Sequence, residues 1–347
     1  MLSMTTASAG EGPRQGVRRQ PSAEQLRLLT KVAKLYHEQG VRQPQIAAQL
    51  HISQPRVSRL LKQAVVAGIV RTVVIPPSGV HTELENAIEL RYGLREVIVV
   101  DASGEDDGHI IPALGAAASV YLETTLTGGD RIGISSWSST LLATVESMTP
   151  RPTQVAEEVV QVLGGVGNPA AQARAARLVG RLADLTGASP VLLPVPGLVG
   201  SVSAKRTLMK DPVVTEVMDA WSRLTLLLVG IGSLEPSPLL KESGNAMTPE
   251  DQKVLRDQDA VGDICLRFFD EAGKPVRSEL DQRVLGLSAA QVRSDDLRSV
   301  GVAGGMRKYA AIRAALLGGW VDVLITDRSV AERLAGEQIS EHRPTQS

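Results

Sequence analysis

Polar and cationic side chains between residues 53 and 62 are spaced so that one face of a helix would carry them. Guanidinium and carboxamide groups can pair with base edges in the major groove of DNA, whereas hydroxyl and ammonium groups contact phosphates. We therefore expect Gln54, Arg56 and Arg59 to contact bases. The rest of the expected DNA interface is Gln43 with three phosphate-contacting residues, Ser53, Ser58 and Lys62.

A helix-turn-helix over residues 43–62 would hold that face outward. Ala47 is the small residue that such a motif needs where its two helices meet, and the turn follows about four residues later. Ser53 can cap the second helix with its side-chain oxygen, and Pro55 fits the first turn. His51 occupies the turn position where glycine is usual, and it tolerates a left-handed backbone less well than glycine does. The alternative use of such a three-helix element is contact with another protein.

Glycines and hydroxyl groups follow several of the predicted strands, Lys308 lies on the helix after one of them, and Asp263 comes just before another. In parallel α/β sheets, ligands bind beyond the carboxyl ends of the strands, and free amides at a helix start favour anions. Asp263 can accept hydrogen bonds from sugar hydroxyls, and Lys308 suits a phosphate or an array of hydroxyls. Each feature also has an ordinary structural use as a helix cap, a turn or a solvated side chain. The expected effector site is Ser136, Trp137, Ser138, Ser139, Thr140, Gly232, Asp263, Gly304, Gly305 and Lys308.

Catalytic constellations are missing from the sequence. Its five histidines form no metal-spaced cluster with Cys, Asp or Glu, and no Ser-His-Asp arrangement is evident. We therefore expect no metal, no cofactor and no catalytic residue. The alternative is a sugar-phosphate isomerase or deaminase with an added DNA-binding head and Asp263 as its base, but we identify no partner acid. A pure interaction scaffold is a third hypothesis, which leaves the glycine-rich strand ends without a purpose.

Two kinds of scaffold are needed to position these residues. Helical periodicity predicts three helices within residues 22–67, the first capped by Ser22, and a strand follows at 69–75. Beyond residue 82, short Val- and Ile-rich runs alternate with helices, which is typical of a mostly parallel sheet covered on both faces. The predicted strands are 96–100, 131–135, 159–163, 191–195, 224–231, 264–269, 299–303 and 321–326. The predicted helices in this part are 83–92, 112–125, 139–147, 171–186, 308–316 and 329–335.

Charge divides the chain near the same point. Residues 1–75 hold 11 Lys and Arg against 3 Asp and Glu, and the remainder holds 26 against 35. A basic head on an acidic body indicates a polyanionic partner for the head, although an uneven solvated surface explains the charge alone equally well. The expected divisions are a disordered tail at 1–21, a DNA-binding domain at 22–75, a linker at 76–81, an effector domain at 82–338 and a second disordered tail at 339–347.

Bulk composition excludes several classes of protein. The single cysteine, Cys265, permits no disulfide framework within one chain and fits a reducing cytosol. No apolar run approaches the roughly 18 residues that span a bilayer, so we expect a cytoplasmic protein without a membrane partner. An aromatic content of 3% argues against a base-stacking binder of single strands.

Taken together, these motifs resemble the SorC-type sugar-binding transcriptional regulators, a family grouped with deoxyribonucleoside regulators (SorC/DeoR). The resemblance extends from Leu26 to Leu334. Besides the helix-turn-helix, the matching segments are Ala67–Val70, Gly129–Gly133, Trp137, Thr140-Leu141, Gly164–Gly167, Leu193–Pro196, Gly230–Gly232, Phe268–Gly273 and Val302–Gly305 with Lys308.

That resemblance implies a winged-type helix-turn-helix domain followed by an α/β domain like the sugar-phosphate isomerase and deaminase folds, used as a sensor. It also implies a phosphorylated sugar as the typical effector and a homo-oligomer, dimer or tetramer. The family commonly has glycine on each side of the tryptophan, where this chain has Ser136 and Ser138. Because the larger residues narrow a phosphate cradle or replace its backbone donors, the effector class we expect includes unphosphorylated sugars and polyols. We expect a DNA-binding regulator of carbohydrate metabolism whose operator binding such an effector modulates.

Overall fold

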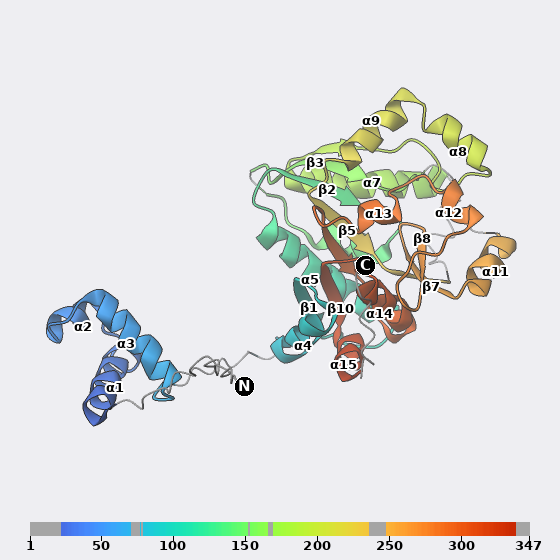
Figure 1. The fold of residues 1–347 in the computed structure, drawn as a ribbon. Coiled ribbons are helices and arrows are strands. Elements are labelled where there is room, and N and C mark those ends of the chain that lie inside the picture. The colour runs from blue at the N-terminus through green and yellow to red at the C-terminus, as the bar shows by residue number, and fades with distance from the viewer. Residues whose placement is uncertain are drawn as a thin grey trace, which may run out of the picture. The chain divides into compact units, whose positions relative to one another are not determined.

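The chain divides into two compact units, Met1–Ile75 and Pro76–Ser347. A computed structural model describes residues 22–70, 77, 79–151, 153–165, 169–235 and 248–337 (Figure 1). The predicted tails at 1–21 and 339–347, and most of the predicted linker, lie outside the described residues.

The first unit contains the three predicted helices, α1 (Ala23–His37), α2 (Gln43–Gln49) and α3 (Gln54–Val66). The expected cap of the first helix is confirmed, since the Ser22 side chain accepts a hydrogen bond from the Gln25 amide. Apolar residues of all three helices form one small core, centred on the fully buried Val32, Ile46 and Val57. Of the strand predicted at 69–75, only residues 69 and 70 are described, and neither lies in a strand.

A seven-stranded sheet organises the second unit, and every pair of neighbouring strands in it is parallel. The strand order is β1-β10-β9-β5-β2-β3-β4. The strands are β1 (Glu96–Val100), β2 (Asp130–Ile134), β3 (Ala156–Gln161), β4 (Ser189–Val191), β5 (Leu226–Gly230), β9 (Arg298–Val302) and β10 (Val323–Asp327). The predicted α/β class with a parallel sheet is therefore confirmed.

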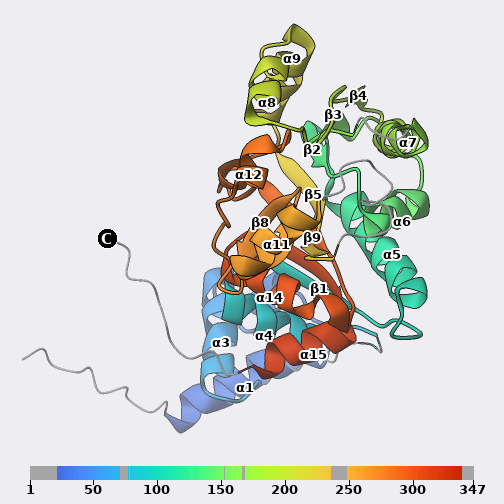
Figure 2. The same cartoon turned by 90° about the vertical axis from the view of Figure 1, so that its right-hand side faces the viewer.

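Helices cover both faces of this sheet, as the continuous apolar runs predict. Figure 2 shows α5 (Asp107–Thr125), α6 (Ser139–Ser147) and α7 (Pro169–Thr186) together on one side. On the other face, α4 (Thr82–Tyr92) and α15 (Arg328–Gly336) contact β1. Because side chains alternate along a strand, Leu226 and Leu228 of β5 belong to the core under α5, and Leu227 and Val229 belong to the opposite core.

One predicted strand, 264–269, is wrong. These residues belong to a hairpin of β7 (Ala260–Ile264) and β8 (Arg267–Asp270), which forms a small antiparallel sheet with β6 (Gly232–Ser233). The turn consists of Cys265 and Leu266, whose φ angles of 54° and 60° are left-handed. Two left-handed residues are what a two-residue hairpin turn requires, but neither is the Gly, Asn or Asp that signals such a turn in a sequence. The apolar run through the turn therefore looked like a single strand.

Other boundaries also differ from the prediction. Helix α5 begins five residues before Pro112, because the Asp106 carboxylate caps it by accepting the Gly108 and His109 amides. The strand predicted at 191–195 is shorter and ends at Val191. Helices and turns with no prediction are α8 (Val202–Leu208), α9 (Pro212–Trp221), α11 (Pro249–Asp257), α12 (Glu279–Arg283), α13 (Ala289–Val292) and the 3₁₀ turn η1 (Met306–Lys308), which leads into α14 (Tyr309–Leu317).

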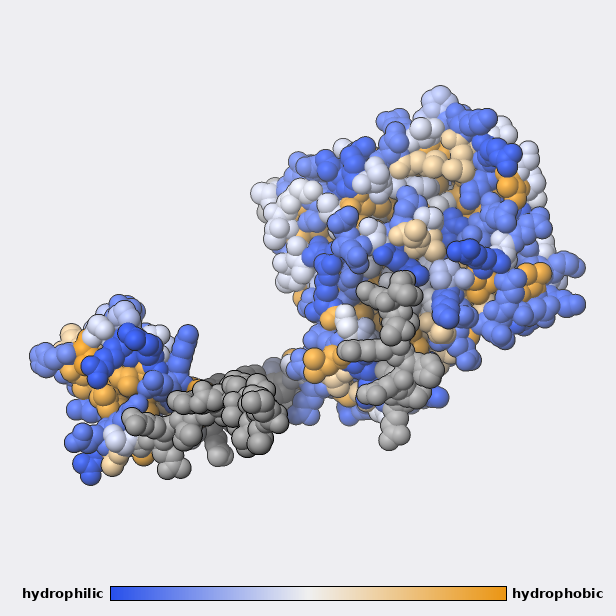
Figure 3. Space-filling view, viewed as in Figure 1, coloured by the Kyte–Doolittle hydropathy of each residue, from blue (hydrophilic) through white to orange (hydrophobic). Residues whose placement is uncertain are grey.

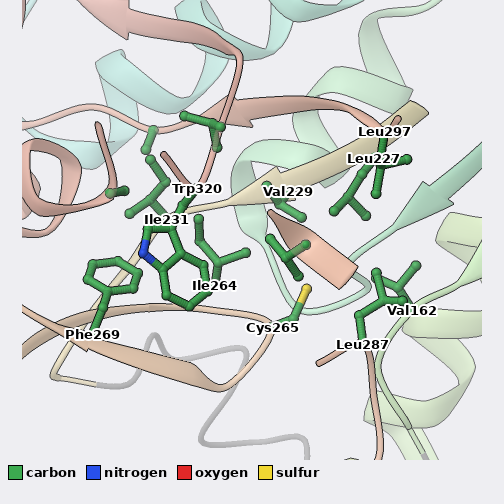
Figure 4. Close-up of a cluster of buried hydrophobic side chains, with 14 of the residues drawn as sticks. Val162, Leu227, Val229, Ile231, Ile264, Cys265, Phe269, Leu287, Leu297 and Trp320 are labelled. Atoms are coloured by element: carbon green, nitrogen blue, oxygen red, sulfur yellow. The ribbon is translucent and has the colours of Figure 1, made fainter. Parts of the chain in front are cut away.

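The hairpin is anchored in the larger core. Figure 4 shows Phe269 and Trp320 side by side, with Ile264 and Cys265 reaching toward the strands of the main sheet. The two rings lie 4.9 Å apart between centroids, and the Trp320 indole donates to the Gly273 carbonyl at 2.8 Å. Rigid packing at its base holds the strained tip of the hairpin in place.

The surface of the second unit, in the view of Figure 3, is largely hydrophilic with scattered apolar groups. Within the residues described, no helix has the length and apolar character needed to cross a membrane.

Candidate functional site

The outer face of α3 carries the residues that were expected to contact DNA. Gln54, Arg56, Arg59 and Lys62 are exposed, while Val57, Leu60 and Leu61 on the opposite side are buried against α1 and α2. The Arg59 guanidinium donates to the Pro55 carbonyl at 3.3 Å, which holds it along the helix. Ser53 is also exposed, whereas Ser58 and Gln43 are half-buried at the edge of this surface.

The local geometry follows the sequence motif at two positions and departs from it at one. Ala47 is nearly buried where α2 meets α3, and His51 has a left-handed φ of 51° in the turn. The expected side-chain cap by Ser53 is wrong, since its hydroxyl accepts no hydrogen bond from the helix. The Ser53 carbonyl takes the Arg56 and Val57 amides instead, at 2.9 and 3.1 Å. The Ser53 hydroxyl is therefore left on the surface.

A cavity of about 110 Å³ opens at the carboxyl ends of β2, β5 and β9. These are central strands, and the chain reverses its direction of winding between β2 and β5, which is where α/β sheets bind ligands. The residues lining the cavity come from α5, the loop after β2, the loop after β5, the β7–β8 turn and the segment after β9. Segments that are far apart in the sequence, including the start of helix α5 and Leu163 after β3, thus converge on one concave site.

The loop after β2 forms the first wall and ends in helix α6. Ser138 caps that helix by accepting the Leu141 amide at 3.3 Å. Trp137 is buried, and its indole donates to the Gly164 carbonyl at 3.2 Å. A Cβ on Gly165 would lie 3.1 Å from the Trp137 ring, so the missing side chain of Gly165 leaves room for the indole.

The β7–β8 hairpin forms the second wall and carries Asp263. One carboxylate oxygen accepts the Leu266 amide at 2.9 Å, which closes the left-handed turn. The other oxygen lies so close to Gly232 that a Cβ there would be 2.0 Å away. Burial raises the pKa of Asp263 to about 6, opposed by the Leu266 hydrogen bond and by the charge of Lys308. Burial also raises the pKa of the Cys265 thiol to about 12, so that thiol stays protonated.

The segment after β9 forms the third wall. Gly304 lies against the carboxylate of Asp327, and a Cβ on it would be 2.5 Å from that group. The Lys308 ammonium group has no hydrogen bond or ion pair with any residue in the described part of the chain, and burial lowers its pKa. Arg307 is paired with Asp107 at 2.8 Å across the mouth of the cavity. A single unpaired ammonium group therefore faces the cavity together with Asp263.

Most of the expected effector residues meet in this cavity. Those that line it are Trp137, Ser138, Ser139, Thr140, Gly232, Asp263, Gly304 and Lys308. Two expected residues do not line it. Ser136 is buried with its hydroxyl unpartnered among the described residues, and Gly305 lines a neighbouring groove while donating to Asp327 at 2.6 Å.

The sequence prediction missed the α5 side of the cavity. Asp107, Ile110, Ile111 and Leu114 line it from the first turns of that helix. The signal that could have found them is Asp106. Aspartate is a favoured N-cap residue, and here its carboxylate accepts the Gly108 and His109 amides at the start of α5. No group of three His, Cys, Asp or Glu side chains suited to a metal occurs within the part of the chain that the structure describes.

Comparisons with known proteins agree with this arrangement. A family described as "Putative sugar-binding domain" matches residues 78–335. The chain is 32% identical over 314 residues to the deoxyribonucleoside regulator of Bacillus subtilis (strain 168), covering 90% of this chain and 99% of that protein. It is 29% identical over 317 residues to the sorbitol operon regulator of Klebsiella pneumoniae, with 90% and 99% covered.

Solved structures give the same result. The full-length sorbitol operon regulator of Klebsiella pneumoniae superposes with a TM-score of 0.67 at 29% identity, over 89% of this chain and 98% of that one. The sugar-binding domain of the DeoR regulator from Pseudomonas syringae pv. tomato is 43% identical, with a TM-score of 0.59, over 74% of this chain and all of that one.

A helix-turn-helix with an exposed polar face, together with a parallel α/β domain that has a polar cavity at its strand ends, defines a DNA-binding transcriptional regulator with a sensor domain. The chain belongs to the SorC-type (SorC/DeoR) family of sugar-binding transcriptional regulators. This family assignment supports the regulator hypothesis and not the alternative of a sugar-phosphate isomerase or deaminase.

Proposed function

We propose that the protein binds operator DNA through α3 and changes its operator affinity when a small carbohydrate enters the cavity at the strand ends. The observation that carries the proposal is the convergence of Asp263, Lys308 and the start of α6 on one concave site at the switch point of the sheet. These are the acceptor, donor and hydroxyl groups that a polyhydroxylated ligand needs. Relatives that regulate sorbitol, erythritol and deoxyribonucleoside genes are consistent with a ligand of this kind.

The DNA-binding half of the proposal rests on the exposed face of α3. Gln54 and Arg56 lie in the first turn, where a recognition helix places its base-reading side chains. Arg59 and Lys62 follow one and two turns later on the same face, and the exposed Ser53 hydroxyl lies at the start of the helix. We assign bases to Gln54, Arg56 and Arg59. Phosphates are assigned to Ser53, Ser58 and Lys62, with Gln43 at the edge of the interface.

The proposal excludes turnover. Asp263, Asp107 and Glu235 are the carboxylates among the described residues lining the cavity, and no histidine lines it. Asp107 is bound to Arg307 and Glu235 is exposed, so the proposal assigns neither of them to Asp263 as the paired acid that isomerisation or deamination requires. The closely similar relatives are named as regulators, which supports a sensor without catalysis.

The oligomeric state and the location of the protein are inferred from its proposed DNA partner and its buried thiol. Helix-turn-helix proteins read half-sites about one helical turn apart, so a homo-oligomer, dimer or tetramer, fits a pseudo-palindromic operator. In this proposal the second unit supplies the contacts between the copies of the oligomer. Residues 76–81 link the second unit to the DNA-binding unit. A buried free thiol and a DNA partner both suit the cytoplasm.

The test uses full-length protein and fluorescently labelled DNA from upstream of its own gene, at several salt concentrations. Arg56→Ala is expected to weaken binding roughly 10-fold or more, the cost of about 1–3 kcal/mol for a lost base contact. Gln63→Ala is the matched control, because Gln63 is exposed on α3 outside the assigned set. Equal affinity of the parent protein, Arg56→Ala and Gln63→Ala for this DNA would contradict the proposal.

A further inference from the structure

We propose that the cavity is built for an uncharged polyol or open-chain sugar, and that Ser138 and Asp263 exclude the phosphate ester of the same molecule. This inference deepens the proposed function and rests on it. It concerns the charge of the ligand, which the cavity's own residues determine.

The charge balance of the cavity is the first argument. Among the residues that the structure describes, five charged side chains line it, namely Asp107, Glu235, Asp263, Arg307 and Lys308. Arg307 and Asp107 neutralise each other at 2.8 Å, so one ammonium group remains against two carboxylates. A phosphate monoester carries a charge of roughly −1.5 to −2 at neutral pH and would be held next to an already negative surface. An uncharged ligand meets no such repulsion.

The start of α6 gives the second argument. A helix N-terminus binds an anion through its free amides. Here the Ser138 hydroxyl takes one of these amides, that of Leu141, at 3.3 Å. The backbone amides of Ser138, Ser139 and Thr140 are left for a ligand. The cap of the helix thus uses one of the amide donors that a phosphate would need.

The position of the Ser138 side chain gives the third argument. A Cβ built on Gly230, the last residue of β5, would lie 2.7 Å from the Ser138 hydroxyl oxygen and 3.1 Å from its Cβ. The serine therefore packs directly on the bare backbone of Gly230, between two strand ends that line the cavity. It occupies space at the helix terminus that a residue without a side chain would leave open for phosphate oxygens.

The remaining groups match a chain of hydroxyls. A hydroxyl both donates and accepts, so a vicinal diol is best held between an acceptor and a donor. Asp263 offers one oxygen that is not used by the Leu266 amide, and Lys308 offers an ammonium group with no partner among the described residues. The apolar side of the cavity, which would face the C–H groups of a polyol, is formed by Ile110, Ile111, Leu114, Leu163, Ile231 and Leu266.

The experiment is a calorimetric titration of full-length protein with erythritol, xylitol, sorbitol and pentoses, each beside its own monophosphate. The expected result is that at least one uncharged compound binds, roughly 10-fold or more tightly than its phosphate ester. A phosphate ester that binds more tightly than its parent compound overturns this inference and leaves the proposed function intact. If no uncharged compound and no ester binds, the proposed function fails as well.

A variant tests the role of Ser138 directly. Ser138→Gly frees the Leu141 amide and opens the space against Gly230, so the preference for the uncharged ligand is expected to fall about 5-fold or more through tighter binding of the ester. Ser201→Gly is the matched control, because Ser201 caps α8 by accepting the Ala204 amide and does not line the cavity. An unchanged preference in Ser138→Gly refutes the role of Ser138.

The second variant is Asp263→Asn, which keeps an acceptor for the Leu266 amide and removes one negative charge. It is expected to bind the uncharged ligand less tightly and the ester more tightly than the parent protein does. If Ser138→Gly fails to fold, this variant still decides the charge argument. Parallel losses of both affinities would refute it.

Discussion

Replacing Asp263 with asparagine is expected to stabilise the ligand-free protein while it weakens the effector site. The side chain of asparagine has nearly the same shape, and its carbonyl oxygen can still accept the Leu266 amide that closes the hairpin turn. What the substitution removes is a carboxylate whose ionised form is disfavoured by burial.

The magnitude follows from the pKa. Burial raises the pKa of Asp263 from an ordinary value of 3.8 to about 6. At about 1.36 kcal/mol per pKa unit, ionising this group costs the native state up to ~3 kcal/mol relative to the unfolded chain. The folded state holds its proton more tightly, so native stability falls as pH rises from about 4 to about 6. The cost is absent below pH 4 and complete above pH 7.

Urea unfolding of parent and Asp263→Asn proteins between pH 4 and pH 8 measures this effect. Trp137, Trp221 and Trp320 are the three tryptophans of the chain and all lie in the second unit, so their fluorescence follows that unit alone. The variant's advantage in unfolding free energy is expected to grow from near zero at pH 4 to as much as ~3 kcal/mol at pH 8.

Asp270→Asn is the control for losing a carboxylate from the same hairpin. Asp270 accepts the Ala272 and Lys274 amides but does not line the cavity. The reasoning would be refuted if Asp263→Asn were no more stable than the parent protein at pH 8. It would also have to show the same difference in unfolding free energy from the parent at pH 4 as at pH 8. The expected gain would instead identify Asp263 as a residue kept at the expense of stability for the sake of a ligand.

Three further substitutions test other parts of the structure. Gly232→Ala is expected to displace the Asp263 carboxylate, 2.0 Å from the new Cβ, and to weaken polyol binding about 10-fold in calorimetry; unchanged affinity would contradict this. His51→Val is expected to destabilise the first unit by ~1–2 kcal/mol through its left-handed backbone, with His51→Gly as control, measured by amide hydrogen exchange in α2 and α3; equal exchange in both variants would count against it. Trp137→Phe removes the indole hydrogen bond to the Gly164 carbonyl and is expected to cost ~0.5–1.5 kcal/mol in urea unfolding; an unchanged unfolding free energy would contradict this.

The strands of the large sheet could be predicted from sequence because each is buried on both faces. Such strands are continuous runs of Val, Ile and Leu, and Glu96–Val100 was predicted with its exact bounds. The end of such a run also marks the carboxyl edge of the sheet, so Gly304 and Lys308 were expected in the site. Asp263, which comes just before its predicted strand, was assigned to the same site as an acceptor for sugar hydroxyls. The prediction worked where burial alone determines the residue type.

The prediction failed where a side chain, rather than periodicity, determines the backbone. The left-handed turn of Cys265 and Leu266 carries no glycine or asparagine, and the Asp263 carboxylate that stabilises it lies two residues upstream of Cys265. The predicted helix 112–125 begins at Pro112, whereas Asp106 caps α5 six residues earlier. Both errors concern segments that line the cavity. The misplaced start of α5 is the reason why the α5 side of the cavity was missed.

The central claim is that a ligand held by Asp263 changes how α3 binds DNA. The direct measurement is the affinity of full-length protein for its upstream DNA, with and without the uncharged ligand that binds most tightly in calorimetry. The affinity is expected to change about 5- to 150-fold in the parent protein and to stay unchanged in Asp263→Asn, whose ligand-free DNA affinity should equal that of the parent. A ligand that binds the parent protein but leaves its DNA affinity the same, or that shifts both proteins equally, would contradict the claim.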